Sequence, residues 1–146
     1  MASYNKRIVR HQQVVFSHTT TVSPEWLTPS PLNLLGLRGE IRHVKCRLEV
    51  GSPAGSTIDL YVADQSLSPM ASTPKDEDVF YANTGTALTA SATAASISDN
   101  PGATGGALYE VTPLVGPTSN LAVGVELTGP LGAYTILVDV WAEVQL

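Results

Sequence analysis

The chain has 146 residues and a net charge of −5, and only 14% of its residues are charged, against a usual share of about 25%. Small and turn-forming residues are abundant: 13 Ser, 15 Thr, 15 Ala, 12 Gly and 10 Pro. This composition does not suit a helical bundle and favours short strands joined by Gly/Pro turns. A transmembrane helix is excluded because no apolar run approaches about 18 residues. An internal disulfide is excluded because Cys46 is the single cysteine.

The charge is unevenly distributed along the chain. Residues 1–47 hold seven of the eight basic residues and two acids, whereas residues 48–146 hold one lysine and 11 acids. Two explanations are open: opposite charges pair within one sheet, or a basic N-terminal arm at 1–12 reaches an acidic partner. Nucleic acid is not expected as a direct partner, because the pI is about 5.0 and aromatics are not interleaved with the basic residues.

The first half of the chain contains strand patterns separated by proline and glycine. Residues 13–22 alternate between apolar and polar side chains, which predicts a strand. In the connection at 23–39, three prolines exclude a long helix and a paired ladder. Residues 40–50 alternate again. Arg42 falls on the inward parity, so that strand begins after it or contains a bulge.

The remaining strands follow at short intervals. Residues 57–64 come after the loop at 51–56, which predicts a hairpin with 40–50 in which Lys45 and Arg47 face Asp59. Three further strands are expected: 78–83, 86–98 and 107–112.

The C-terminal region has the clearest alternation. Residues 121–128 and 133–146 predict a hairpin of two long antiparallel strands around a GPLG turn. The count reaches about eight strands without a convincing helix. We therefore expect an all-β domain over 13–146, a single antiparallel β-sandwich of jelly-roll or Greek-key type with an N-terminal arm.

No catalytic or metal-binding motif is visible. Three histidines lack the spacing of a zinc site: His11, His18 and His43. Cys46 points to the buried face of its strand, where a thiol behaves as a small apolar group. Outward acids leave a carbohydrate-cleaving pair open as a small-hydrolase alternative: Asp59, Glu126 and Asp139. The main expectation is a protein without enzymatic activity, cofactor or metal.

Several apolar residues lie where a solvated surface is expected. Leu137 and Trp141 point outward on the last strand, Tyr61 points outward on its own strand, and Trp26 lies in the Pro-rich connection. Such residues together indicate a patch covered by another subunit. The alternative is that the 23–39 connection covers the second face. Both can hold, with Trp26 closing over one edge while Leu137 and Trp141 meet a neighbour.

The whole chain is similar in style to a known class of assembly proteins. The features are an N-terminal ASYNKRIVRHQ segment, the central RHVKCRLEVGSPAGSTIDLYVAD and the late LAVGVELTGPLGAYTILVDVWAEV. They resemble small virion structural proteins of tailed bacteriophages, of the capsid decoration (cement) type. The resemblance rests on no diagnostic motif, so no functional residue of that class of proteins is assigned to a position of this chain. It implies a protein of the virion, assembled in the host cytoplasm, that binds the major capsid protein or other virion subunits as a homotrimer.

This resemblance gives roles to the surface residues. The expected capsid contacts lie on the arm: Lys6, Arg7 and Arg10. The expected subunit interface comprises Leu137, Trp141, Tyr61 and Trp26. No membrane partner is expected. The rival hypothesis is a binding module of a phage tail, baseplate or head fibre, in which Tyr61, Trp141 and Trp26 stack against carbohydrate.

Overall fold

A computed structural model describes most of the chain. The described residues are 7–20, 22–33, 38–50, 55–64, 74, 79–89, 95–101, 107–110 and 121–145. Their strands are β1 (Arg7–Thr20), β2 (Glu25–Trp26), β3 (Ser30–Pro31), β4 (Arg38–Val50), β5 (Thr57–Asp64), β6 (Val79–Ala87), β7 (Ile97–Asp99), β8 (Ala107–Glu110), β9 (Leu121–Thr128) and β10 (Gly132–Gln145). Within these ranges, no helix is long and apolar enough to cross a membrane.

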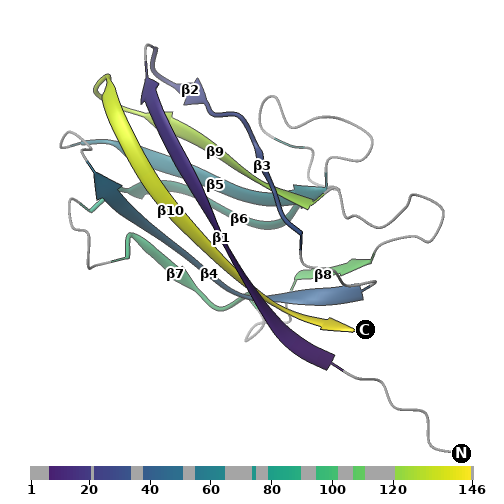
Figure 1. Cartoon of the computed structure of the whole chain (residues 1–146). Helices are drawn as coiled ribbons and strands as arrows, with labels where there is room; N and C mark the ends of the chain where they lie inside the picture. The colour runs from purple at the N-terminus through teal and green to yellow at the C-terminus, as the bar shows by residue number, and fades with distance from the viewer. Residues whose placement is uncertain are drawn as a thin grey trace, which may run out of the picture.

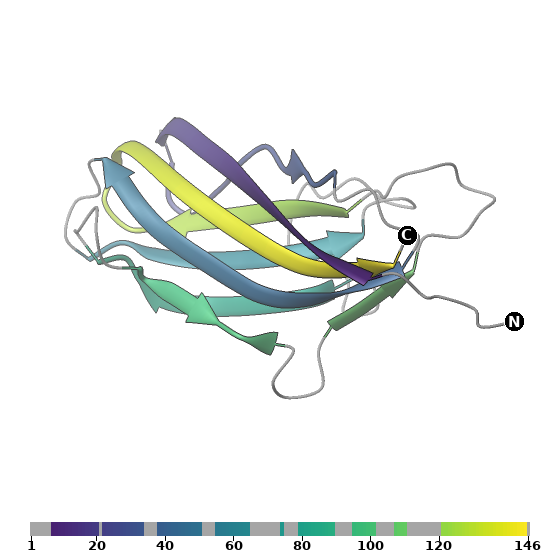
Figure 2. The ribbon, with the colours of Figure 1, turned by 60° about the horizontal axis from the view of Figure 1, so that its bottom comes forward.

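The strands form two antiparallel five-stranded sheets that pack face to face (Figures 1 and 2). Sheet A has the order β1-β10-β4-β7, with β8 also paired to β4. Sheet B has the order β2-β9-β5-β6, with β3 also paired to β9. The predicted all-β sandwich is therefore confirmed.

The pairing of the strands is nested. The first strand pairs with the last, β2 and β3 pair with β9, β4 pairs with β7 and β8, and β5 pairs with β6. β2 and β3 lie end to end along β9, and β7 and β8 lie end to end along β4. Each of these two pairs takes the place of one strand, so the ten segments fill eight strand positions. A folded-back ribbon of eight antiparallel strands divided between two sheets is a jelly roll. Of the two predicted topologies, the strand order selects this one.

Both predicted hairpins are wrong. β4 lies in sheet A and β5 in sheet B, so Lys45 and Arg47 do not face Asp59. Likewise, β9 pairs in sheet B and β10 in sheet A. The physical reason is that alternation shows which side of a strand is buried and not which strand lies beside it. A short glycine-containing loop can join two strands of one sheet or cross between two sheets.

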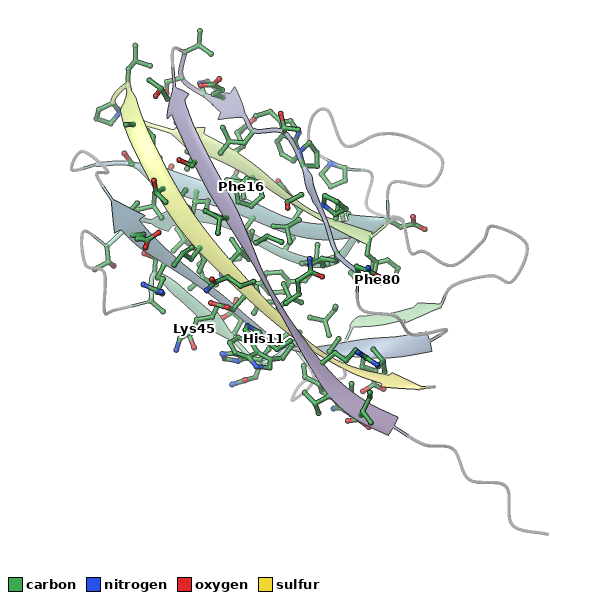
Figure 3. All side chains as sticks on the ribbon, viewed as in Figure 1. His11, Phe16, Lys45 and Phe80 are labelled. Carbon is green, nitrogen blue, oxygen red and sulfur yellow. The ribbon has the colours of Figure 1, made fainter. Side chains whose placement is uncertain are left out.

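The core lies between the sheets and follows the predicted parity closely. On β10 every residue predicted to point inward is buried: Tyr134, Ile136, Val138, Val140, Ala142 and Val144. On β1, Val14 and Phe16 are buried, whereas Val15 and Ser17 on the opposite face are exposed. Phe16 is labelled on this strand in Figure 3. The period-two pattern thus places one face of each long strand in a single core.

The open question about Arg42 is settled by a bulge. The register between β4 and β10 shifts between Trp141 and Ala142. Ile41 before the bulge and Val44 after it are both fully buried, although they differ in sequence parity. The extra residue lets Arg42 leave the core while the strand continues to Arg38.

Several predicted boundaries differ from the structure. β1 begins at Arg7, so residues 7–12 of the expected arm continue the strand, and Arg10 pairs with Ala142 on the core-facing parity. The reason is that 8–12 keep the alternation of the strand and find a partner in the long β10. Lys6 lies outside the described residues. Of the strand expected at 107–112, residues 107–110 form β8, and 111–112 lie outside the described part.

Two other segments also depart from expectation. The connection at 23–39 contains β2 and β3, because a two-residue edge pair tolerates proline: β2 lies between Pro24 and Pro29, and β3 includes Pro31. The strand expected at 78–83 continues to Ala87. The strand expected at 86–98 is not continuous, because Leu88 and Thr89 lie outside any strand and β7 covers only Ile97–Asp99. Residues 90–94 are outside the described part.

Candidate functional site

The four predicted interface residues lie on two opposite faces of the sandwich. Leu137 and Trp141 are on the outer face of sheet A, whereas Tyr61 and Trp26 are on the outer face of sheet B. They cannot form one patch. Each face must therefore be considered separately.

On sheet B, residues of the same chain cover the apolar surface. Tyr61 is buried together with Ala63 and Ala122, and Trp26 and Val79 pack against this cluster. The rings of Trp26 and Tyr61 lie 5.9 Å apart between centroids, with an interplanar angle of 41°. The Pro-rich connection thus covers part of this face, as the alternative proposed, and Tyr61 is not an exposed contact residue.

The outer face of sheet A carries a row of three aromatic rings. Trp141 of β10 lies between His11 of β1 and His43 of β4, in the register of the three strands. Its ring stacks on the His11 ring, with the centroids 4.5 Å apart and an interplanar angle of 20°. The centroid of the His43 ring lies 5.0 Å from that of Trp141, at an interplanar angle of 57°. His43 Nδ1 also lies 2.5 Å from Asn100 Oδ1. Three strands are tied together on their outer side by these contacts.

The next row on the same face is polar. Asp139 is buried, although no second sheet covers this side of β10. Its Oδ1 lies 2.7 Å from His11 Nε2 and accepts a hydrogen bond of 3.1 Å from Gln13 Nε2. Lys45 is its register partner on β4. The neighbouring side chains therefore shield this carboxylate from water.

Pairing of β4 with β10 also explains part of the charge asymmetry. Arg42 contacts the carboxylate of Glu143 at 2.9 Å and that of Glu40 at 2.8 Å. A basic strand from the first third of the chain thus lies beside an acidic strand from its end. In this sheet the opposite charges pair with each other, which agrees with the explanation that the charge asymmetry is balanced within one sheet.

The exposed apolar surface of sheet A is displaced toward β1. Leu137 is only 5% exposed, because it lies in register between Val15 and Arg47. The exposed residues are Val9 at 63% and Val15 at 53%. The prediction named Leu137 and missed the two valines. Their outward parity in the 7–20 alternation is the signal that could have found them.

The two open sides of the sandwich are closed by side-chain hydrogen bonds. On one side the Gln12 side chain makes two hydrogen bonds. Its Nε2 donates to the backbone carbonyl of Pro31 at 3.1 Å, and its Oε1 accepts from the backbone N–H of Asn33 at 2.6 Å. These bonds join the edge of sheet A to the edge of sheet B. A cavity of about 230 Å³ lies between β1 and the 23–39 connection and is lined by Val15, Phe16, Ser17, Leu27 and Thr28.

On the other side, Asp99 of β7 joins sheet A to sheet B. Its Oδ2 accepts hydrogen bonds from the Tyr81 hydroxyl at 2.5 Å and from Asn83 Nδ2 at 3.0 Å. These bonds hold the pKa of Asp99 below its ordinary value, with a smaller contribution from His43. Burial and the neighbouring carboxylate raise the pKa of Tyr81. The arrangement is that of a structural tie between β6 and β7.

The other predicted chemical groups do not converge. Among the described residues, no three His, Cys, Asp or Glu side chains form a cluster that could hold a metal ion. Burial, together with the nearby charge of Asp139, raises the pKa of the Cys46 thiol to about 12. Asp59 and Glu126 are register neighbours on sheet B, but Asp139 is on sheet A, so the three outward acids do not share a site.

Comparisons with known proteins give little information. No protein-family model matches the chain. No curated protein matches it either. Among solved structures the chain is similar to one from Bacillus endospore appendages, described as a novel family of disulfide-linked pili, at 11% identity and a TM-score of 0.41. The match covers 100% of this chain and 96% of that chain. Similarity at this level carries no argument about family or function.

Proposed function

We propose that the protein is a non-enzymatic structural subunit of a virion, a capsid decoration protein that binds the outer shell and stabilises it through subunit interfaces. Its partners are the major capsid protein or other virion subunits, together with further copies of the chain. A homotrimer is the oligomer implied by the resemblance to phage cement proteins. The proposal draws on that resemblance and on the surface of sheet A.

The observation that carries the proposal is the difference between the two outer faces. On sheet B, Ala63 and Ala122 are fully buried and Trp26 packs over Tyr61. On sheet A, the outward side chains of β1 lie at the surface and include the exposed Val9 and Val15. Both of the large apolar side chains that are exposed on described strands lie on this face. This supports sheet A as the surface for protein contacts.

The structure also determines how the expected N-terminal arm at 1–12 can be tested. Removing residues 1–12 would delete nearly half of β1 and break its pairing with β10, so lost binding would not be informative. Removing residues 2–6 deletes Lys6 and leaves the described strand intact, with Arg7 and Arg10 still on it. If Lys6 helps to hold the subunit on an acidic shell, the shortened protein should fold normally but bind particles more weakly.

The proposal is tested on particles isolated by density-gradient sedimentation from cells that produce the virion. The protein should co-sediment with mature particles and, when added back to particles that lack it, should raise the temperature at which they release their genome. A protein that stays in the soluble fraction and leaves particle stability unchanged would contradict the proposal.

One observation favours a second candidate, a carbohydrate-recognising module. The row of Trp141 between two histidines, next to the carboxylate of Asp139 and the amide of Gln13, combines aromatic and polar groups on one surface. Against it, both neighbours of Trp141 already contact its ring, and Tyr61 is buried. Sugar-specific binding on a glycan array, lost in W141A, would support this second function, whereas absence of binding would leave the decoration role.

A further inference from the structure

The four sheet edges of the sandwich differ in how they are protected against pairing with another chain. An edge strand presents unpaired backbone N–H and C=O groups, and natural proteins limit this with short strands, bulges, proline or lysine. In sheet B, one edge consists of the two-residue segments β2 and β3, and the other, β6, has two register irregularities against β5. The far edge of sheet A consists of β7 and β8, of three and four residues.

The remaining edge, β1, has none of these four protections, although it carries one charged residue, Arg10, on the core-facing parity. It is 14 residues long and pairs with β10 without a register shift from Arg7 to Thr20. Its sequence, RIVRHQQVVFSHTT, contains no proline and no lysine. Within the described part of the chain, no strand pairs with its outer edge. Gln12 joins it to Pro31 and Asn33 through its side chain and not through its backbone.

We propose that β1 pairs antiparallel with β1 of a second copy, so that two A sheets join into one continuous sheet across a two-fold axis. Antiparallel pairing places residues of equal parity opposite each other on the same face. A two-fold axis makes such an interface self-complementary, because every contact of one residue with another occurs twice, once in each direction.

The sequence of β1 selects the position of the axis. Val9 and Val15 lie three residues to either side of Gln12, and both point outward and are exposed. With the axis at Gln12, Val9 of each copy lies opposite Val15 of the other. The two exposed valines of the strand then cover each other, and His11 faces Gln13. A different partner could bind this edge, but only a second copy uses this internal symmetry.

This inference rests on the proposed function and deepens it, because it names a partner and the surface that binds it. It replaces the homotrimer that the resemblance implies with a two-fold dimer. The two can fail separately. Particle binding is measured as described above, whereas edge pairing is measured on the purified protein alone. A monomer that still binds particles would overturn only the edge pairing, and a dimer that ignores particles would overturn only the decoration role.

The experiment compares the native mass of four proteins by sedimentation equilibrium over a range of concentrations. In V9K/V15K, two pairs of like charges face each other across the axis. In V9K/V15E, each lysine instead faces a glutamate of the other copy. The control V22K/L131K changes two residues of equal exposure, 56% and 55%, that lie outside β1. Circular dichroism confirms that each variant is folded.

The proposal predicts a concentration-dependent dimer for the wild type and the control. V9K/V15K should raise the dissociation constant about tenfold or more, and V9K/V15E should return it toward the wild-type value. A wild type that stays monomeric or forms trimers overturns the proposal. It is also overturned by a dimer that V9K/V15K leaves intact, and by a V9K/V15E variant that dissociates as readily as V9K/V15K.

Discussion

His11 and Asp139, 128 positions apart in the sequence, are joined by a 2.7 Å contact between Nε2 and Oδ1. The contact links the first strand to the last, which are the outermost pair of the folded-back ribbon. On the same face, Trp141 stacks on His11. The outer surface of sheet A is therefore held together by side chains of its own strands, and it needs no second layer to be ordered.

Removal of the Asp139 carboxylate should destabilise this surface. In D139A, His11 loses an acceptor and Gln13 loses its hydrogen bond, so we expect the free energy of unfolding to fall by about 1–3 kcal/mol. Denaturation in urea measures the change. The control E49A alters an exposed carboxylate of the same sheet and should shift stability by less than about 0.5 kcal/mol. Equal effects of the two variants would show that Asp139 makes no specific contribution.

Gly129 should not tolerate a side chain. It has a φ of +138°, and a Cβ added there would lie 2.8 Å from the Ser56 Cα, where the loop before β5 meets the loop before β10. G129A should therefore lose about 2–3 kcal/mol of stability or more, from strain and steric clash together. G85A is the matched control, because its φ is +69° but a Cβ there meets open space. Thermal unfolding of both variants checks this, and a G129A loss no larger than that of G85A would refute the close approach of the two loops.

The tie between β6 and β7 should depend on the Tyr81 hydroxyl. Y81F removes a donor to the Asp99 carboxylate while keeping the ring in the core. Hydrogen bonds to charged groups contribute about 1.5–3 kcal/mol, so we expect a loss of about 2 kcal/mol in urea denaturation. An unchanged midpoint would mean that Tyr81 contributes only through its packing.

The same tie should give an acid-dependent stability. Because the pKa of Asp99 is lowered in the folded protein, its contribution is fully present above the unfolded pKa of about 4 and is lost as the pH falls through the folded pKa. The stability difference between wild type and D99N should thus be constant above about pH 5 and shrink below pH 4. Urea denaturation across this range measures it. A difference that grows on acidification would have the wrong sign for this account.

Cys46 should be chemically silent in the folded protein. Its side chain is fully buried and its thiol pKa is raised to about 12, so little thiolate exists at pH 8. A disulfide-exchange reagent should label it only on the timescale of unfolding, and at once in denaturant. Rapid labelling under native conditions would indicate that the centre of β4 opens far more easily than its packing implies.

The long strands of the fold were predictable, but the short ones and the pairing were not. The buried parity of β10 follows from local sequence, and so does the choice at Arg42 between a later strand start and a bulge, because each depends on which side of a strand meets the core. Whether β9 and β10 pair or face each other depends on contacts with β5 and β1, which are distant in the sequence. The same limit applies to the surface: the outward parity of Leu137 was correct, yet its burial is decided by its neighbours on β1 and β4.

The β1 side of sheet A is the assembly surface that we propose. Hydrogen–deuterium exchange of backbone amides, compared between dilute and concentrated protein, tests this because it reports on each edge of the sandwich at once. We expect exchange to slow with concentration in a peptide spanning residues 8–16 and to stay unchanged in β6. No concentration dependence in β1, or protection that appears in β6 instead, would contradict it.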